Sequence, residues 1–306
     1  MTITLLLFAY ALAVAGLAPR LLAGAWTRRS PRLTLMLWQA AGGSGLLAVA
    51  LAGISCVAAP GRLAACLEAL VGSDAAAGVL TVVAGLLLPV LLLARLAFVA
   101  AAMTRIQRAE RRRHIQLLSL VGHHDSLLDA TVVAAATASA YCVPGTDRVV
   151  LTDTALRMLE PSELRAVLAH ERAHLAGRHH LVVSWAAVVA RAFPGVPVFR
   201  GLHEATVDLV ELLADDRAVR GESRNSLAWA IAQLGTGDGP AVSLAAGGGR
   251  VLARVERLLD PPRRLPVATR AGGAGAAVAV LAVPVLLAGL PAVVAAGLAA
   301  CPLLFG

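Results

Sequence analysis

The sequence predicts a mainly α-helical membrane protein with four transmembrane helices and an inserted α+β domain. Of its 306 residues, 58% are hydrophobic and only 15% charged, and the mean hydropathy is +0.76. This composition is too apolar for an ordinary soluble domain. Apolar runs of membrane-spanning length also enclose one long, more polar stretch. We therefore expect three transmembrane helices in residues 1–104, a domain in 105–268 and the fourth transmembrane helix in 269–306.

Four apolar runs are long enough to cross the hydrocarbon core of a bilayer. They cover residues 2–18 with a short extension to Trp26, then 33–58, 79–103 and 272–300. A secretory signal peptide is the alternative for the first run. No basic segment precedes this run, and no clear small-x-small cleavage site follows it. We therefore interpret it as the first span.

The arginines fix the expected orientation. All 27 basic residues are arginine, and they cluster in 27–32, in 105–113 and in 263–270, beside the apolar runs. Basic loops stay on the cytoplasmic side. The inserted domain should therefore be cytoplasmic, with both termini outside the plasma membrane. The net charge of +8 is explained by the bilayer, so we expect no direct nucleic-acid binding.

The four cysteines show no CxxC spacing, which argues against a cysteine-ligated zinc site. With the orientation above, Cys56, Cys66 and Cys301 lie near the outer face, where a disulfide is possible. Cys142 lies inside and should be reduced.

The inserted domain is predicted to contain strands and helices. The strands are expected at 128–135 and 147–152, with a turn at Pro144-Gly145 between them. Helices are expected at 161–178, 181–190, 203–220, 225–235 and 249–259. The apolar stretch 181–199 is too short to cross the membrane twice. We interpret it as a buried or membrane-touching helix.

One motif within the helix at 161–178 carries the chemistry, namely His170-Glu171-Arg172-Ala173-His174. Residues four apart lie on the same face of a helix, so both imidazoles can bind one metal ion. Glu171 lies beside the first histidine and is placed to take a proton from the attacking water. HExxH is the helical half of a zinc-hydrolase site, and a third protein ligand completes such a site.

Glu211 is the candidate third ligand, and Asp215 follows four residues later on the same helix face. Asp215 is placed to accept a hydrogen bond from the outer nitrogen of a zinc histidine. The alternative is an amphipathic helix with a solvated acidic edge. The HExxH motif in the same domain favours the ligand interpretation.

These stretches resemble the gluzincin membrane peptidases, which include the HtpX and CAAX-protease types. The likeness is greater to BlaR/MecR-type peptidases, and the segments that carry it lie in 140–145, 149–152, 164–175 and 178–180. The plan of three spans, a domain and one span agrees with it. Two departures stand out. The HtpX pattern often has arginine where this chain has Asp208, and a chain without lysine has no Ser-x-x-Lys motif for sensing β-lactams.

The resemblance implies that His170, His174 and Glu211 bind zinc, with Glu171 as the catalytic base and Asp215 behind the ligands. It implies an endopeptidase acting on a protein substrate, either a repressor-type transcription factor or a membrane protein under quality control. It also implies that the strand at 148–152 is a sheet edge that pairs with the substrate. The sequence gives no signal for an oligomeric state.

Two alternatives to this interpretation remain. One is a non-catalytic receptor or scaffold stabilised by zinc, for which Glu171 would be unnecessary. The other is an intramembrane protease of the site-2 type, which the arginines flanking the motif disfavour. These arginines are Arg165, Arg172 and Arg178.

The remaining histidines have simpler explanations than catalysis. We expect a polar turn at His123-His124-Asp125, a helix end at His179 and His180, and a surface position for His203. The sequence names no residue for oxyanion stabilisation.

Overall fold

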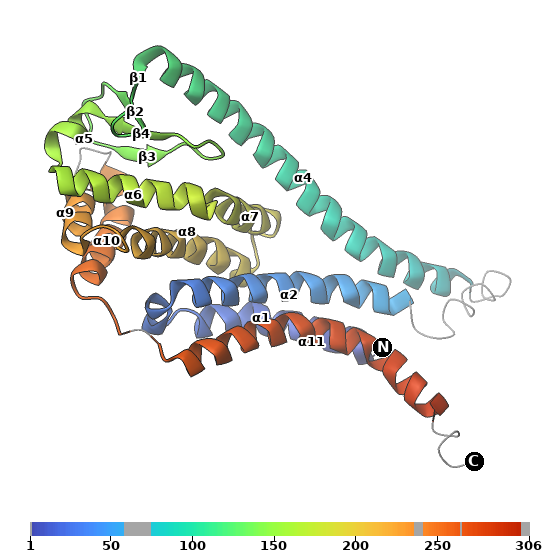
Figure 1. The fold of residues 1–306 in the computed structure, drawn as a ribbon. Helices are drawn as coiled ribbons and strands as arrows, with labels where there is room; N and C mark the ends of the chain where they lie inside the picture. Colours follow the sequence, from blue (N-terminus) through green and yellow to red (C-terminus); the bar gives the residue numbers. More distant parts are fainter. Residues whose placement is uncertain (1, 58–74, 236–240, 264, 301–306) are drawn as a thin grey trace.

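The computed structural model describes residues 2–57, 75–235, 241–263 and 265–300 (Figure 1). Four of its helices contain windows long and apolar enough to cross a membrane. They are α1 (Thr2–Leu21), α2 (Pro31–Val57), α4 (Ala75–Val121) and α11 (Val267–Ala300). A short 3-10 helix, η1 (Ala25–Arg29), connects the first two. The four predicted runs are thus found as helices. The possible disulfide among Cys56, Cys66 and Cys301 concerns side chains that lie outside the described part of the chain.

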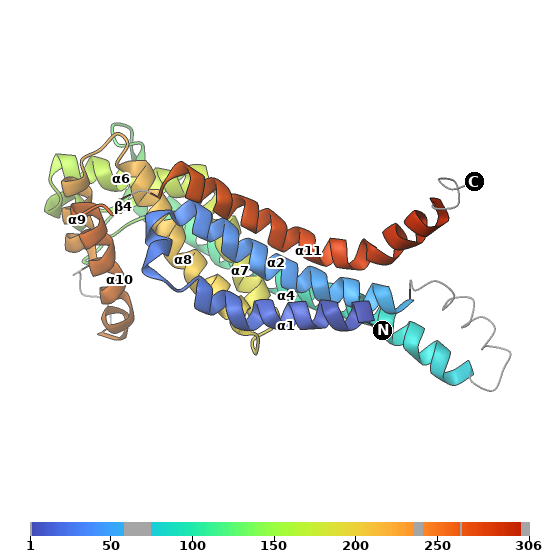
Figure 2. The ribbon, with the colours of Figure 1, turned by 90° about the horizontal axis from the view of Figure 1, so that it is seen from below.

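Helices α1, α2 and α11 run side by side, and α4 crosses α2 at one end and then diverges from it (Figures 1 and 2). The crossing is close. A Cβ on Gly53 of α2 would lie 2.6 Å from the carbonyl oxygen of Gly85 and 2.7 Å from Cδ of Pro89 on α4. Glycine at position 53 therefore permits backbone contact between the two helices, as small residues do in membrane bundles.

We expect Gly53→Ala to force α2 and α4 apart and to destabilise the protein by about 1–3 kcal/mol, as overpacking does. Gly45→Ala on the same helix is the matched control, because nothing lies within 4 Å of a Cβ built there. Thermal unfolding of both variants in detergent measures the difference. Equal melting temperatures for the two variants would contradict the close crossing.

Helix α4 is 47 residues long and does not end where the third predicted span ends. It continues through the basic block, because arginine, glutamine and glutamate are good helix formers and no proline or glycine interrupts that segment. Gly122 follows its last residue. The long helix thereby connects the membrane bundle to the small sheet at the far end of the molecule (Figure 1).

The sheet has four short strands in the order β1-β2-β4-β3. The strands are β1 (Gly122–Asp125), β2 (Ala130–Val133), β3 (Ala140–Cys142) and β4 (Val149–Thr152). β2 and β4 are parallel, and the two outer pairs are antiparallel. The predicted strands at 128–135 and 147–152 correspond to β2 and β4, whose residues are all buried.

Two expectations about the sheet are wrong. The strand at 148–152 is not an edge, because β4 pairs with β2 on one side and β3 on the other. The edge beside α6 is β3, which is too short to show a strand pattern. His123-His124-Asp125 is not a turn but lies in the other edge strand, β1. The turn comes just afterwards, where Asp125 accepts hydrogen bonds from the backbone N–H groups of Leu127 and Leu128.

Six helices complete the described domain: α5 (Asp153–Met158), α6 (Pro161–Gly177), α7 (His179–Ala192), α8 (Pro197–Ala218), α9 (Arg224–Gly235) and α10 (Ala241–Leu259). Helix α6 begins with Pro161, and Glu160 and Glu163 form a reciprocal capping box there. Helix α8 begins six residues before the predicted start, because Pro197 is its first residue, a position that favours proline.

Helices α7 and α8 lie between α2 and α4, with α8 packed against α2 and α7 against α4 (Figure 1). Trp38 of α2 belongs to one buried cluster with Phe199 and Leu202 of α8. Arg95, inside the third span, donates a hydrogen bond to the carbonyl oxygen of Ala192 at the end of α7, with an N···O distance of 3.3 Å. One face of the predicted apolar helix at 181–190 is therefore buried against the spanning helices, while Leu181 and Trp185 are exposed. Its neighbour α8 connects this packing to the site described next.

Candidate active site

The two histidines of the HExxH motif lie one above the other on α6. His170 is 6% exposed, and its Nε2 lies 3.1 Å from Nε2 of His174. Glu211 reaches both from α8, with carboxylate oxygens 3.5 Å from Nε2 of His170 and 3.4 Å from Nε2 of His174. Within the described residues, these three are the group whose ligand atoms converge, all within 4.8 Å of one another.

This geometry fits a metal ion. Two imidazoles and one carboxylate form a three-ligand set that leaves a fourth position free, as in catalytic zinc sites. With bonds of about 2.0–2.1 Å, tetrahedral coordination separates neighbouring donor atoms by about 3.3 Å. The observed separations of 3.1–3.5 Å agree with this value, so the cluster could hold a metal.

Asp215 supports His170 from behind. Its Oδ1 lies 2.9 Å from Nδ1 of His170, and its side chain is only 1% exposed. A proton on Nδ1 would face this carboxylate, which leaves Nε2 free to face the metal. The structure thus brings Asp215 to the place that the sequence predicted for it.

Arg254 of α10 was not predicted. Its Nη1 lies 2.8 Å from Glu211, and its Nη2 and Nε lie 2.7 and 2.9 Å from the two oxygens of Asp215. Burial alone would raise the pKa of Glu211, but the hydrogen bonds from both histidines and the charge of Arg254 hold this pKa below its usual value. The histidines and the arginine together therefore favour the ionised form of Glu211, and His170 and Arg254 lower the pKa of Asp215 in the same way. It lies 43 residues after Glu211, in one more amphipathic helix, and no sequence pattern singles it out.

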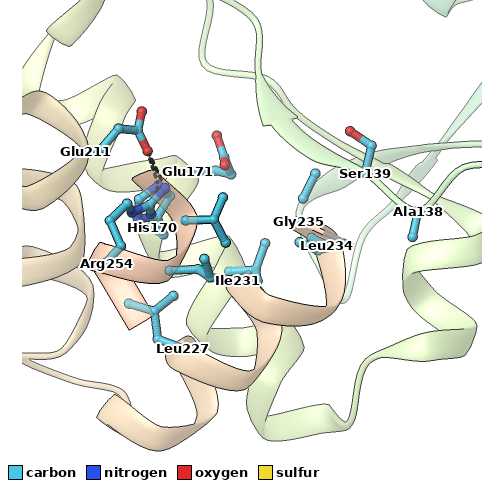
Figure 3. A pocket seen from close by; sticks show the side chains of 13 residues that line it. Ala138, Ser139, His170, Glu171, Glu211, Leu227, Ile231, Leu234, Gly235 and Arg254 are labelled. Carbon is cyan, nitrogen blue, oxygen red and sulfur yellow. Dashed lines mark hydrogen bonds and ion pairs between the residues drawn. The ribbon is translucent and has the colours of Figure 1, made fainter. Parts of the chain in front are cut away.

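Glu171 lines a cavity beside His170 (Figure 3). Burial raises the pKa of its carboxyl group, and the nearby charges of both histidines and the backbone of Cys142 act in the opposite direction. Burial, and then the nearby carboxylate of Glu171, raise the pKa of the Cys142 thiol to about 12. The edge strand β3 therefore touches the predicted base directly. A thiol with such a pKa stays protonated beside the Glu171 side chain.

The cavity has a volume of about 300 Å³ and two unlike sides. Ser139 and Ala140, at the start of β3, form one side. The other side is apolar and comes from α9 and α10 (Figure 3). Its members are Leu227, Ile231, Leu234 and Val251. His170, Glu171, Glu211 and Arg254 also line this space, so the metal cluster is open to a ligand.

Two of the remaining histidines differ from the expectation. His179 is not merely a helix end, because its Nδ1 lies 3.0 Å from Nδ1 of His174. Burial lowers the pKa of His179 to about 4, so its ring is neutral. His203 is half-buried on α8 rather than on the surface, and it does not line the cavity.

Comparison with protein families gives one finding. Residues 107–193 match the model of peptidase family M48. The matched range covers the sheet, α6 with its HExxH motif, and α7, and it ends before Glu211. Comparisons with curated proteins and with solved structures give no match. The match does not distinguish the BlaR/MecR type within this class of peptidase.

The family match and the metal cluster together support a hydrolase of the metalloprotease class. The four apolar helices support a membrane protein. Glu211 lies outside the matched range, so its part in the site rests on the geometry alone.

Proposed function

We propose that this protein is a multi-pass membrane endopeptidase that uses zinc and cleaves a protein substrate at a cytoplasmic active site. The observation that carries the proposal is the convergence of His170, His174 and Glu211 beside Glu171 at an open cavity. A site that served only to hold the fold together would need neither a carboxylate base nor an opening for substrate.

The residues divide the chemistry among them. Zinc held by His170, His174 and Glu211 would supply Lewis acidity, which polarises a carbonyl group and makes water a stronger acid. Glu171 accepts the proton of the attacking water and passes it to the nitrogen of the leaving amine. Asp215 and Arg254 hold the ligands in place and are not consumed. His170, His174 and Glu211 bind the ion.

The substrate backbone would lie along β3. This strand pairs with β4 on one side only, and its start lines the cavity. An extended peptide can add to such an edge through main-chain hydrogen bonds, which bind many sequences. The apolar side of α9 and α10 then faces the substrate side chains. Substrate binding at a sheet edge, which was predicted for residues 148–152, is therefore assigned to the neighbouring strand β3.

The orientation is supported by the arginines at the ends of the spans. The site lies at the end of the molecule where these arginines gather, and α1 begins and α11 ends far from it (Figure 1). The positive-inside rule places that end in the cytoplasm. A repressor-type transcription factor and a cytoplasmic segment of a membrane protein are both substrates that such a site could reach.

Metal removal tests the proposal. The full chain, purified in detergent, should contain about one zinc ion and cleave casein. A chelator should abolish cleavage, and added zinc should restore it. Bound zinc without any cleavage would instead favour the non-catalytic receptor or scaffold, because such a protein needs the metal only for its stability. Cleavage that persists after complete zinc removal would also contradict the proposal.

A further inference from the structure

The two histidines of the metal cluster are supported by different partners. Nδ1 of His170 faces the carboxylate of Asp215 at 2.9 Å, whereas Nδ1 of His174 faces Nδ1 of His179 at 3.0 Å. The rings of His174 and His179 meet edge to face, with an interplanar angle of 85°. The Asp215 contact follows from the ExxxD pattern, and the His179 contact does not.

We propose that His179 is a positioning residue that orients His174 for metal binding, and that Gly177 provides the space its ring needs. The proposal rests on the proposed metal site and adds two residues to it. Neither residue touches the metal or the substrate.

The hydrogen bond has one workable direction. Nε2 of His174 faces Glu211 and His170, so this nitrogen is the metal-binding atom and must be unprotonated. The proton of a neutral His174 is then on Nδ1, which donates it to Nδ1 of His179. His179 therefore acts as an acceptor and carries its own proton on Nε2. This contact fixes both the tautomer and the rotation of the His174 ring.

The backbone explains how a residue five positions later reaches His174. In an uninterrupted helix, five residues turn the side chain by about 140° relative to the first, so His179 would point away. Here α6 ends at Gly177, and Arg178 adopts a left-handed conformation with φ 48° and ψ 39° before α7 begins. That single residue redirects the chain, and the ring of His179 folds back beside the last turn of α6.

Gly177 is required because the ring occupies the place of its side chain. A Cβ at this position would lie 2.3 Å from Nε2 and 2.5 Å from Cδ2 of His179. No real Cβ contact is so short, so any side chain at 177 must displace the ring. Glycine is needed at 177 for the space it leaves and not for its backbone freedom, because the residue in the left-handed conformation is Arg178.

The test measures zinc affinity of the full chain in detergent by competition with a chromophoric chelator. His179→Ala should weaken zinc binding about 10–100-fold, the range seen when a partner behind a metal ligand is lost. His179→Asn should recover most of that loss, because the asparagine oxygen occupies the position of Nδ1. His179→Gln should not, because its polar atoms lie one bond further out. His180→Ala is the control and should bind zinc like the unaltered protein.

Gly177→Ala should reproduce the effect of His179→Ala although it removes no polar group. In the double variant, the loss should be no larger than in either single variant, because both act through one contact. Melting temperatures of the zinc-free forms check that each variant is folded. Unchanged zinc affinity in His179→Ala, or full additivity in the double variant, would overturn the inference. If the unaltered protein binds no zinc, both this inference and the proposed function fail. If that protein binds zinc and cleaves substrate but the variants bind zinc equally well, only this inference fails.

Discussion

Replacement of Glu171 by glutamine is expected to lower the rate of cleavage about 10²–10⁴-fold, the usual contribution of a general base. Glutamine has nearly the same shape, so the three ligand side chains should keep their positions and zinc should remain bound. Glutamine cannot accept a proton, and the attacking water then loses its base. Among the residues that the structure describes, the other carboxylate that lines the cavity is Glu211, which pairs with Arg254 and both histidines.

Two measurements on the purified variant check this result. Zinc content should equal that of the unaltered protein, and casein cleavage should fall to the stated level. Glu222→Gln is a suitable control, because this carboxylate pairs with exposed Arg165, at 3.7 Å, and does not line the cavity. Normal cleavage by Glu171→Gln would show that the base is assigned wrongly. A loss of zinc together with activity would leave Glu171 a structural role only.

The inactive variant also identifies the substrate. Proteomes of cells carrying the unaltered protein and cells carrying Glu171→Gln should differ in one or a few proteins that accumulate uncut in the latter. A single accumulated repressor would favour a signalling role. Accumulation of several membrane proteins would favour quality control. Because both variants bind zinc, this comparison separates the effect of cleavage from any effect of the folded protein alone.

The parts of the site that the sequence predicts are those with a local pattern. His170, Glu171 and His174 lie within one helical turn and a half, so their mutual placement follows from helix geometry alone. Glu211 and Asp215 repeat the same four-residue spacing on a second helix. Their contact with α6 could be predicted only from metal chemistry, because two histidine ligands require a third protein ligand. The structure brings all five side chains to one place.

The residues that the sequence did not predict depend on features without a pattern. Arg254 reaches the site only because α10 packs beside α8 and α9, and nothing in its own helix distinguishes it from Arg250 or Arg257. The contact of His179 depends on a single left-handed residue, Arg178, which is neither glycine nor asparagine. The edge position of β3 depends on how four very short strands order themselves, and such strands carry too few residues to show alternation.

The membrane helices show the same division. Their lengths and apolar character are properties of each run, and the structure has a helix at each predicted run. The position of α7 and α8 between α2 and α4 depends on tertiary packing, which no single apolar run predicts. Arg95 is an example. It lies within an apolar run, and nothing in the sequence indicates that its partner is the carbonyl oxygen of Ala192, 97 residues later.

Arg254→Met is expected to destabilise the zinc-free protein by about 3–5 kcal/mol, the range for breaking a buried ion pair from one side. The arginine is 17% exposed and binds Asp215, which is 1% exposed, through two hydrogen bonds. It also pairs with Glu211. Methionine fills a similar volume without a charge. Asp215 would then lose its arginine partner, which is costly because this buried carboxylate cannot be solvated.

Bound zinc should reduce the loss of stability caused by Arg254→Met. A divalent cation bound by Glu211 supplies the positive charge that the variant lacks, so saturation with zinc should stabilise Arg254→Met more than it stabilises the unaltered protein. The measurement is the melting temperature of each protein in detergent, with and without zinc. The double variant Arg254→Met/Asp215→Asn should be more stable than Arg254→Met when zinc is absent, because the second change removes the unpaired buried charge.

Arg257→Met provides the matched control on the same helix. Arg257 binds Asp216 through two hydrogen bonds of 2.8 and 3.0 Å, and neither residue lines the cavity. Its replacement should lower the stability to the same extent with and without zinc, because this pair does not contact the metal ligands. If Arg254→Met and Arg257→Met respond alike to zinc, Arg254 does not balance the charge of the metal ligands. The arginine would then be only a link between α8 and α10.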